Sequence, residues 1–92
     1  MSNRSAENGA VDVFIAACMD SWRKIAPSYV QSTQQPLVGH LRELHAEGAT
    51  AWQFHEALEM AFAKPGVKKR DALRYAHGIV RHQLREASPD GA

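Results

Sequence analysis

The sequence has 92 residues, 45% of them hydrophobic, and a single cysteine, Cys18. This length favours one domain, and one cysteine excludes both an intramolecular disulfide and a thiolate-rich zinc site. No apolar run approaches the roughly 20 residues of a membrane span, and the N-terminus lacks the apolar core of a signal peptide. We therefore expect a cytoplasmic protein that has no membrane partner.

The formal net charge is only +1, but the charges are unevenly distributed along the chain. Residues 1–63 carry four basic and seven acidic side chains, a net charge of −3. Residues 64–92 carry seven basic and three acidic side chains, a net charge of +4. This asymmetry favours an anionic partner that binds the last third of the chain.

Apolar periodicity predicts helices throughout and no strand, so we expect an all-α fold, a compact bundle of about four helices in one domain over residues 10–87. The polar residues 1–9 are predicted to form a flexible N-terminal tail. Apolar residues then recur at three- and four-residue steps, and Pro27 ends this first helix. Residues 28–35 are predicted to be a loop, whose Tyr29 could dock a partner.

The second and third predicted helices are marked by local signals at their ends. The second begins at Pro36 and ends at Gly48, a glycine in the position that often terminates a helix. Its apolar stripe consists of Leu37, Leu41 and Leu44. The third begins with Thr50 and Gln53, which have the spacing of a capping box, and ends at the Lys64-Pro65-Gly66 break.

The fourth predicted helix runs from Lys69 or Asp71 to Ala87, and residues 88–92 are predicted to be a flexible C-terminal tail. On a helical wheel, one face carries only basic or potentially basic side chains: Arg70, Arg74, His77, Arg81 and Arg85. Arginines four residues apart repel one another, and no acid lies between them on this face. Such a face favours a bound anion, because guanidinium groups bind phosphate bidentately.

We therefore predict a nucleic-acid-binding surface, formed by Lys68, Lys69, Arg70, Arg74, Tyr75, His77, Arg81 and Arg85. Binding is expected to be directed mostly at the nucleic-acid backbone, because this face offers cations and few amide groups that read bases. Tyr75 could stack on an unpaired base. The alternative is a solvated face whose arginines pair with acids of neighbouring helices, such as Glu43, and it stays open, as does the choice between single- and double-stranded DNA.

The segment LRELHAEGATAWQFHEALEMAF, with ALRYAHGIVRHQL after it, resembles the C-terminal domain of DnaD-type replication-initiation proteins of bacteria and phages. Ala57–Ala61 match a pair of alanines in that family, and Tyr75 and Ile79 match the first two positions of its Tyr-x3-Ile-x3-Trp motif. Gln83 stands in place of the tryptophan. The resemblance covers residues 12–86 and implies DNA binding through the basic helix, with replication-initiation or helicase-loading proteins as partners.

Two other classes of function stay open. The last two helices are also similar to a helix-turn-helix, which would make residues 69–81 the recognition helix of a transcriptional regulator. A third class is a protein-interaction module that does not bind nucleic acid, because the chain is rich in aromatic residues. We expect most of them to lie in the core, whereas an exposed tryptophan, Trp22 or Trp52, would mark a homo-oligomer or partner surface.

Nothing in the sequence indicates catalysis, a cofactor or a metal site. The five histidines form no pair at four-residue spacing, and H-E-x-x-H, C-x-x-C and glycine-rich phosphate-binding motifs are absent. Cys18 lies among apolar residues, so we expect a buried thiol and not a nucleophile. We therefore predict a non-enzymatic protein.

Overall fold

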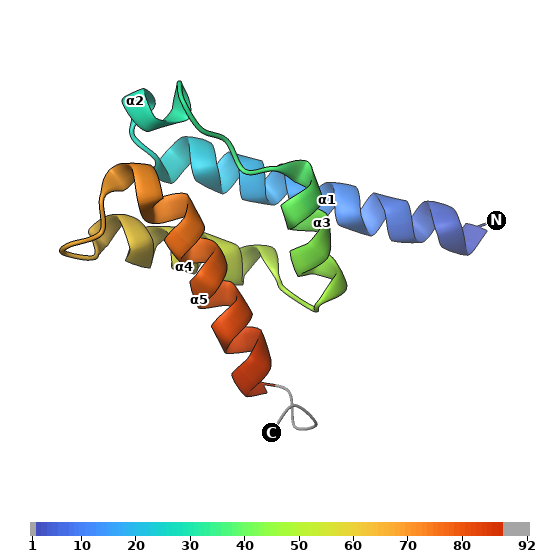
Figure 1. Cartoon of the computed structure of the whole chain (residues 1–92). Coiled ribbons are helices and arrows are strands. Elements are labelled where there is room, and N and C mark those ends of the chain that lie inside the picture. Colours follow the sequence, from blue (N-terminus) through green and yellow to red (C-terminus); the bar gives the residue numbers. More distant parts are fainter. Residues whose placement is uncertain (1, 88–92) are drawn as a thin grey trace.

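The computed structural model describes residues 2–87, and all regular structure within them is helical, which confirms the predicted all-α class (Figure 1). The elements are α1 (Ser2–Ile25), α2 (Ser28–Gln31), α3 (Val38–Ala46), α4 (Ala51–Ala63), a 3-10 turn η1 (Lys69–Asp71) and α5 (Ala72–Ala87). Apart from the single-turn α2, the α-helices correspond to the four predicted ones. None of the described helices is long and apolar enough to cross a membrane.

Two helix boundaries and one additional short helix differ from the prediction. Helix α1 already begins at Ser2 and so includes most of the predicted N-terminal tail, whose flexibility stays a prediction. The predicted loop after Pro27 contains the short helix α2. Helix α3 begins two residues after Pro36, because Leu37 keeps an extended backbone with φ −82° and ψ 130°. The tail predicted over residues 88–92 lies outside the described residues.

The signals at the junction between α3 and α4 are confirmed. The Thr50 hydroxyl accepts a hydrogen bond from the Gln53 backbone N–H at 3.1 Å, and the Gln53 side chain accepts one from the Thr50 N–H at 2.9 Å. This capping box satisfies two amide groups that the helix itself leaves unpaired. Gly48 has φ +100°, a left-handed conformation that favours glycine and allows the chain to leave α3.

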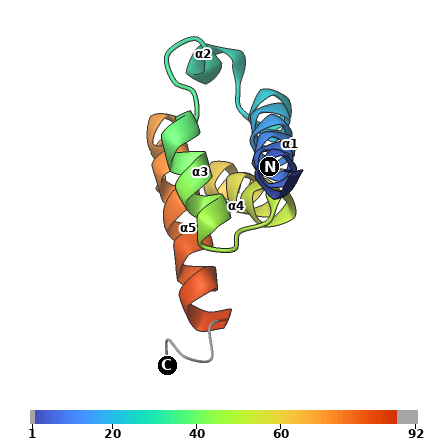
Figure 2. The ribbon, with the colours of Figure 1, turned by 90° about the vertical axis from the view of Figure 1, so that its right-hand side faces the viewer.

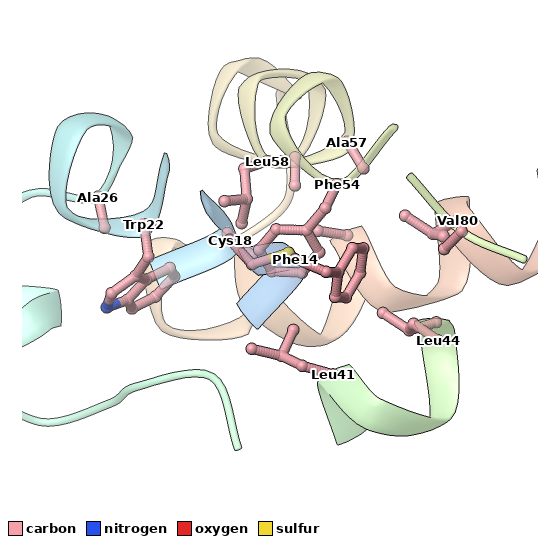
Figure 3. Close-up of a cluster of buried hydrophobic side chains, with 14 of the residues drawn as sticks. Phe14, Cys18, Trp22, Ala26, Leu41, Leu44, Phe54, Ala57, Leu58 and Val80 are labelled. Atoms are coloured by element: carbon pink, nitrogen blue, oxygen red, sulfur yellow. The ribbon is translucent and has the colours of Figure 1, made fainter. Parts of the chain in front are cut away.

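Helix α4 lies at the centre of the packing, because both α1 and α5 pack against it, while α3 packs against α1. In a view along the axis of α1, helices α3 and α5 lie together on one side of the molecule (Figure 2). Side chains from α1, α3, α4 and α5 meet in one core (Figure 3). Its largest fully buried members are Trp22, Phe54, Leu41, Leu44, Leu58, Val80 and Cys18. Cys18 is buried as predicted, and burial raises the pKa of its thiol to about 12, so it is an unreactive thiol at neutral pH.

The two tryptophans have opposite environments. Trp22 is 1% exposed and packs against Phe62, with ring centroids 5.9 Å apart. Trp52 is 66% exposed and stacks on His55 at 5.4 Å. Trp52 is therefore an exception to the prediction that most of the aromatic residues lie in the core. The reason is its position two residues before the buried Phe54, which is roughly 200° away around the helix.

The two tryptophans predict a clear contrast in stability. We expect Trp22→Ala to lower the free energy of unfolding by about 3–5 kcal/mol, because it leaves a cavity in the core. Trp52→Ala serves as the matched control. It should change the free energy of unfolding by less than about 0.5 kcal/mol, because the Trp52 side chain is largely in water. Urea unfolding followed by circular dichroism measures both values. Similar losses for the two variants would contradict the arrangement of α4.

Candidate nucleic-acid interface

The orientation of α5 is set by its apolar side. Ala72, Ala76 and Val80 are fully buried, and α5 packs mainly against α4. The opposite side of the helix therefore faces solvent. Arg74 and Arg85 are exposed there, and Arg70 is exposed on the preceding turn η1. Within residues 2–87, none of these three arginines forms an ion pair.

His77 does not belong to the exposed basic face. It is half-buried, with its ring centroid 5.8 Å from that of Phe54 and 5.6 Å from that of His40, in edge-to-face contacts. Burial lowers the pKa of His77, the positive charges of His40 and Arg81 lower it further, and Glu43 partly opposes these effects. His77 is therefore neutral at pH 7, so this potentially basic residue adds no positive charge to the face at that pH.

Arg81 is turned toward α3. One of its terminal nitrogens, Nη2, lies 3.2 Å from the Glu43 carboxylate, and the side chain is less than half exposed. Its Nε is buried and has no hydrogen-bond partner in the described part of the chain. Arg81 is therefore paired with an acid of a neighbouring helix, which is the alternative that the sequence left open for the arginines of this face.

The two lysines before α5 have different roles. Lys69 donates a hydrogen bond from Nζ to the Phe62 carbonyl at 2.6 Å, and its ammonium lies 5.8 Å from the centroid of the Phe62 ring. It thus satisfies a carbonyl in the last turn of α4, where a positive charge is favourable. Lys68 is exposed and makes no ion pair within residues 2–87.

A groove of about 820 Å³ separates α5 from the segment that leads into α3, and we call it the arginine groove. It is lined by Thr33, Gln34, Gln35, Leu37, His40, Arg70, Asp71, Leu73, Arg74, His77, Gly78 and Arg81. The Gln34 side-chain amide donates to the Arg70 carbonyl at 2.6 Å and so holds this segment next to the start of α5. The groove combines three arginines with two histidines and one acid.

A second, smaller hollow of about 530 Å³ lies next to the arginine groove. It is lined by Gly66, Val67, Lys68, Asp71, Arg74 and Tyr75. Arg74 lines both hollows, and Tyr75, 37% exposed, borders the smaller one. Arg85 lines neither and lies near the C-terminal end of α5. The predicted surface is therefore divided between two hollows and an isolated arginine.

Sequence reasoning missed one whole wall of the arginine groove. The residues of this wall lie more than 29 positions before α5 in the sequence, so periodicity within α5 could not identify them. They are Thr33, Gln34, Gln35, Leu37 and His40. Leu37 was expected in an apolar stripe but is 60% exposed. A polar run rich in amide groups between two helices is the one signal in the sequence that could have indicated them.

The described residues contain no cluster of three or more histidine, cysteine, aspartate or glutamate side chains that could hold a metal ion. No family model, no curated protein and no solved structure matches this chain. The resemblance to DnaD-type domains therefore stays a prediction, and the site is interpreted from its own geometry.

The lowered pKa of His77 predicts that the protein loses stability in mild acid. The unfolded chain binds a proton at His77 near the ordinary pKa of 6.5, whereas the folded chain does so only at lower pH. The free energy of unfolding should therefore be highest above pH 6.5 and decrease as the pH falls from 6.5 toward the lowered pKa. Urea unfolding at pH 8, 7, 6 and 5 measures this slope. His77→Gln should flatten the dependence of the free energy of unfolding on pH. The control His82→Gln, at an exposed position of α5, should leave this dependence unchanged. An unchanged slope in His77→Gln would contradict the prediction.

Proposed function

We propose that this chain is a non-enzymatic nucleic-acid-binding domain that contacts phosphates through α5 and the turn before it. The observation that carries this proposal is the pair Arg70 and Arg74. Both are exposed, both line the arginine groove, and neither forms an ion pair within the described residues. An arginine that no internal acid neutralises is available for a bidentate phosphate contact.

Arg81 is compatible with this proposal although it pairs with Glu43. The Arg81 side chain is 43% exposed and that of Glu43 62% exposed, and ion pairs in such surroundings contribute only about 0–1 kcal/mol. A phosphate in the groove could therefore compete with the Glu43 carboxylate for the guanidinium. Arg81 would then add to the positive charge that Arg70 and Arg74 supply.

We further propose a role as an accessory in bacterial or phage DNA replication, at initiation or helicase loading, in the cytoplasm. This step rests on the resemblance of Tyr75, Ile79 and the basic helix to the DnaD-type domain. A helix-turn-helix regulator is less well supported, because His77 and Arg81 of its expected recognition helix contact α3 instead of facing a DNA groove.

A second candidate function is supported by Trp52. This side chain is 66% exposed on α4, and Met60 of the same helix is 52% exposed. Tryptophan and methionine are enriched at protein–protein interfaces relative to the rest of the surface. A protein-interaction surface on α4, for a second copy of the chain or for a replication protein, is therefore the alternative to nucleic-acid binding.

The main proposal predicts binding of DNA that weakens steeply with salt. We expect fluorescence anisotropy to show that labelled DNA binds at 50 mM salt and that log K falls with log salt with a slope of roughly −2 to −3, because about three phosphates release their counterions. Arg74→Glu should weaken binding at least about tenfold at low salt. Arg42→Glu is the matched control, because Arg42 is exposed and lines neither hollow. Absence of binding by the unchanged protein at low salt would contradict the proposal, as would equal losses in the two variants.

The alternative predicts a change in mass. If α4 carries a self-association surface, light scattering should give a mass above that of the monomer, 10.2 kDa, and Trp52→Ala should restore the monomer mass. Val13→Ala serves as the control, because Val13 is 69% exposed on a different helix. A monomer at all concentrations would exclude self-association through this surface.

A further inference from the structure

We infer that the arginine groove holds one nucleotide unit of an unpaired nucleic-acid strand and that Gly78 keeps the groove open for it. This inference rests on the proposed function and specifies the class of nucleic acid and the residues that would recognise it. It places binding inside a recess whose second wall is the segment from Thr33 to His40, and not on the outer face of α5 alone.

The groove offers separate places for the two parts of a nucleotide. Arg70 and Arg74 lie along α5 and η1 and can bind a phosphate. The opposite wall carries the Gln35 amide and the side-chain oxygen of Gln34, which can hydrogen-bond with the edge of a base, whereas the Gln34 NH2 group already donates to the Arg70 carbonyl. A ligand that is anionic at one end and has hydrogen-bonding groups at the other fits this distribution better than a simple anion does.

A flat base also finds suitable surfaces in the groove. The exposed His40 ring and the arginine guanidinium planes can stack on a base. Leu37 is 60% exposed at the same groove, although it is a large apolar side chain. A base that lies against Leu37 and His40 would remove this apolar surface from water.

The concave shape favours an unpaired strand over a duplex. In a duplex the bases are stacked on one another and paired, so their faces are not available to side chains that lie in a recess. An unpaired strand exposes a phosphate, a base face and a base edge on the same nucleotide, and proteins recognise such strands by stacking and charge together. Only the unpaired strand can use all the surfaces that line this groove.

Gly78 provides an observation that is independent of charge. It lies in the middle of α5, where glycine is among the least favourable residues, and it lines the arginine groove. A Cβ added at this position would meet no atom within 4 Å, so internal packing does not require a glycine here. What a side chain at this position would occupy is the groove itself.

Gly78→Leu tests this inference, because it adds a bulky side chain to the wall of the groove at a position where an added Cβ meets no atom within 4 Å. We expect the variant to bind a labelled ten-residue oligo-dT at least about tenfold more weakly than the unchanged protein, the loss of roughly one stacked base. Its unfolding midpoint in urea should be unchanged or higher. Gly9→Leu is the matched control, since Gly9 is also an exposed helical glycine with no atom within 4 Å of an added Cβ, and it lies on α1, outside both walls of the groove. This control should bind oligo-dT as the unchanged protein does.

Each other outcome has a distinct meaning. If Gly78→Leu binds oligo-dT normally while Arg74→Glu does not, the inference about the groove is wrong and the proposed function stands. If Gly78→Leu weakens a matched duplex as much as oligo-dT, the preference for an unpaired strand is wrong. If an acidic peptide, oligo-glutamate, binds and depends on Gly78 while oligo-dT does not bind at all, the occupant is a protein segment and both proposals fail.

Discussion

The packing of α5 against α4 is the constraint on which the rest of the structure depends. The two helices pack against each other, and both contribute buried alanines to the core, Ala57 and Ala61 on α4 and Ala72 and Ala76 on α5. Small side chains allow two helices to pack closely, and they fix the rotation of each helix about its own axis. This rotation decides which arginines of α5 face water and which face α3. The proposed binding surface is thus a consequence of the core.

The same rotation divides the positive charge of α5 in a way that composition does not reveal. Arg81 is drawn to Glu43 of α3, and His77 is neutral because its ring is partly removed from water. The arginines that stay exposed and unpaired within the described residues are Arg70 and Arg74 near the start of the helix and Arg85 near its end, and only the first two line the arginine groove. A localised pair of cations next to amide and apolar groups suits recognition of one nucleotide better than uniform attraction to a long duplex.

Only the charged side chains on the α5 side of the candidate site could be predicted from the sequence. Residues close together on one helix, such as Arg70 and Arg74, share a face because of the helical repeat, so their cooperation follows from spacing alone. The opposite wall, which carries Gln34, Leu37 and His40, could not be found in this way. It lies next to the start of α5 because two distant segments meet there, where the Gln34 side chain donates a hydrogen bond to the Arg70 carbonyl. Sequence reasoning also placed His77 on the basic face, since a wheel places a residue by its angle and not by its neighbours.

The sequence by itself determined the all-α class, the positions of the four longer helices, the capping box at Thr50 and the turn at Gly48. These features depend on interactions within a few residues, which local sequence specifies. Only the tertiary structure decided that Trp22 is buried while Trp52 is exposed, that Arg81 meets Glu43, and that α5 forms a groove with the segment before α3. These features depend on contacts between helices, and a one-dimensional pattern does not specify which helices meet.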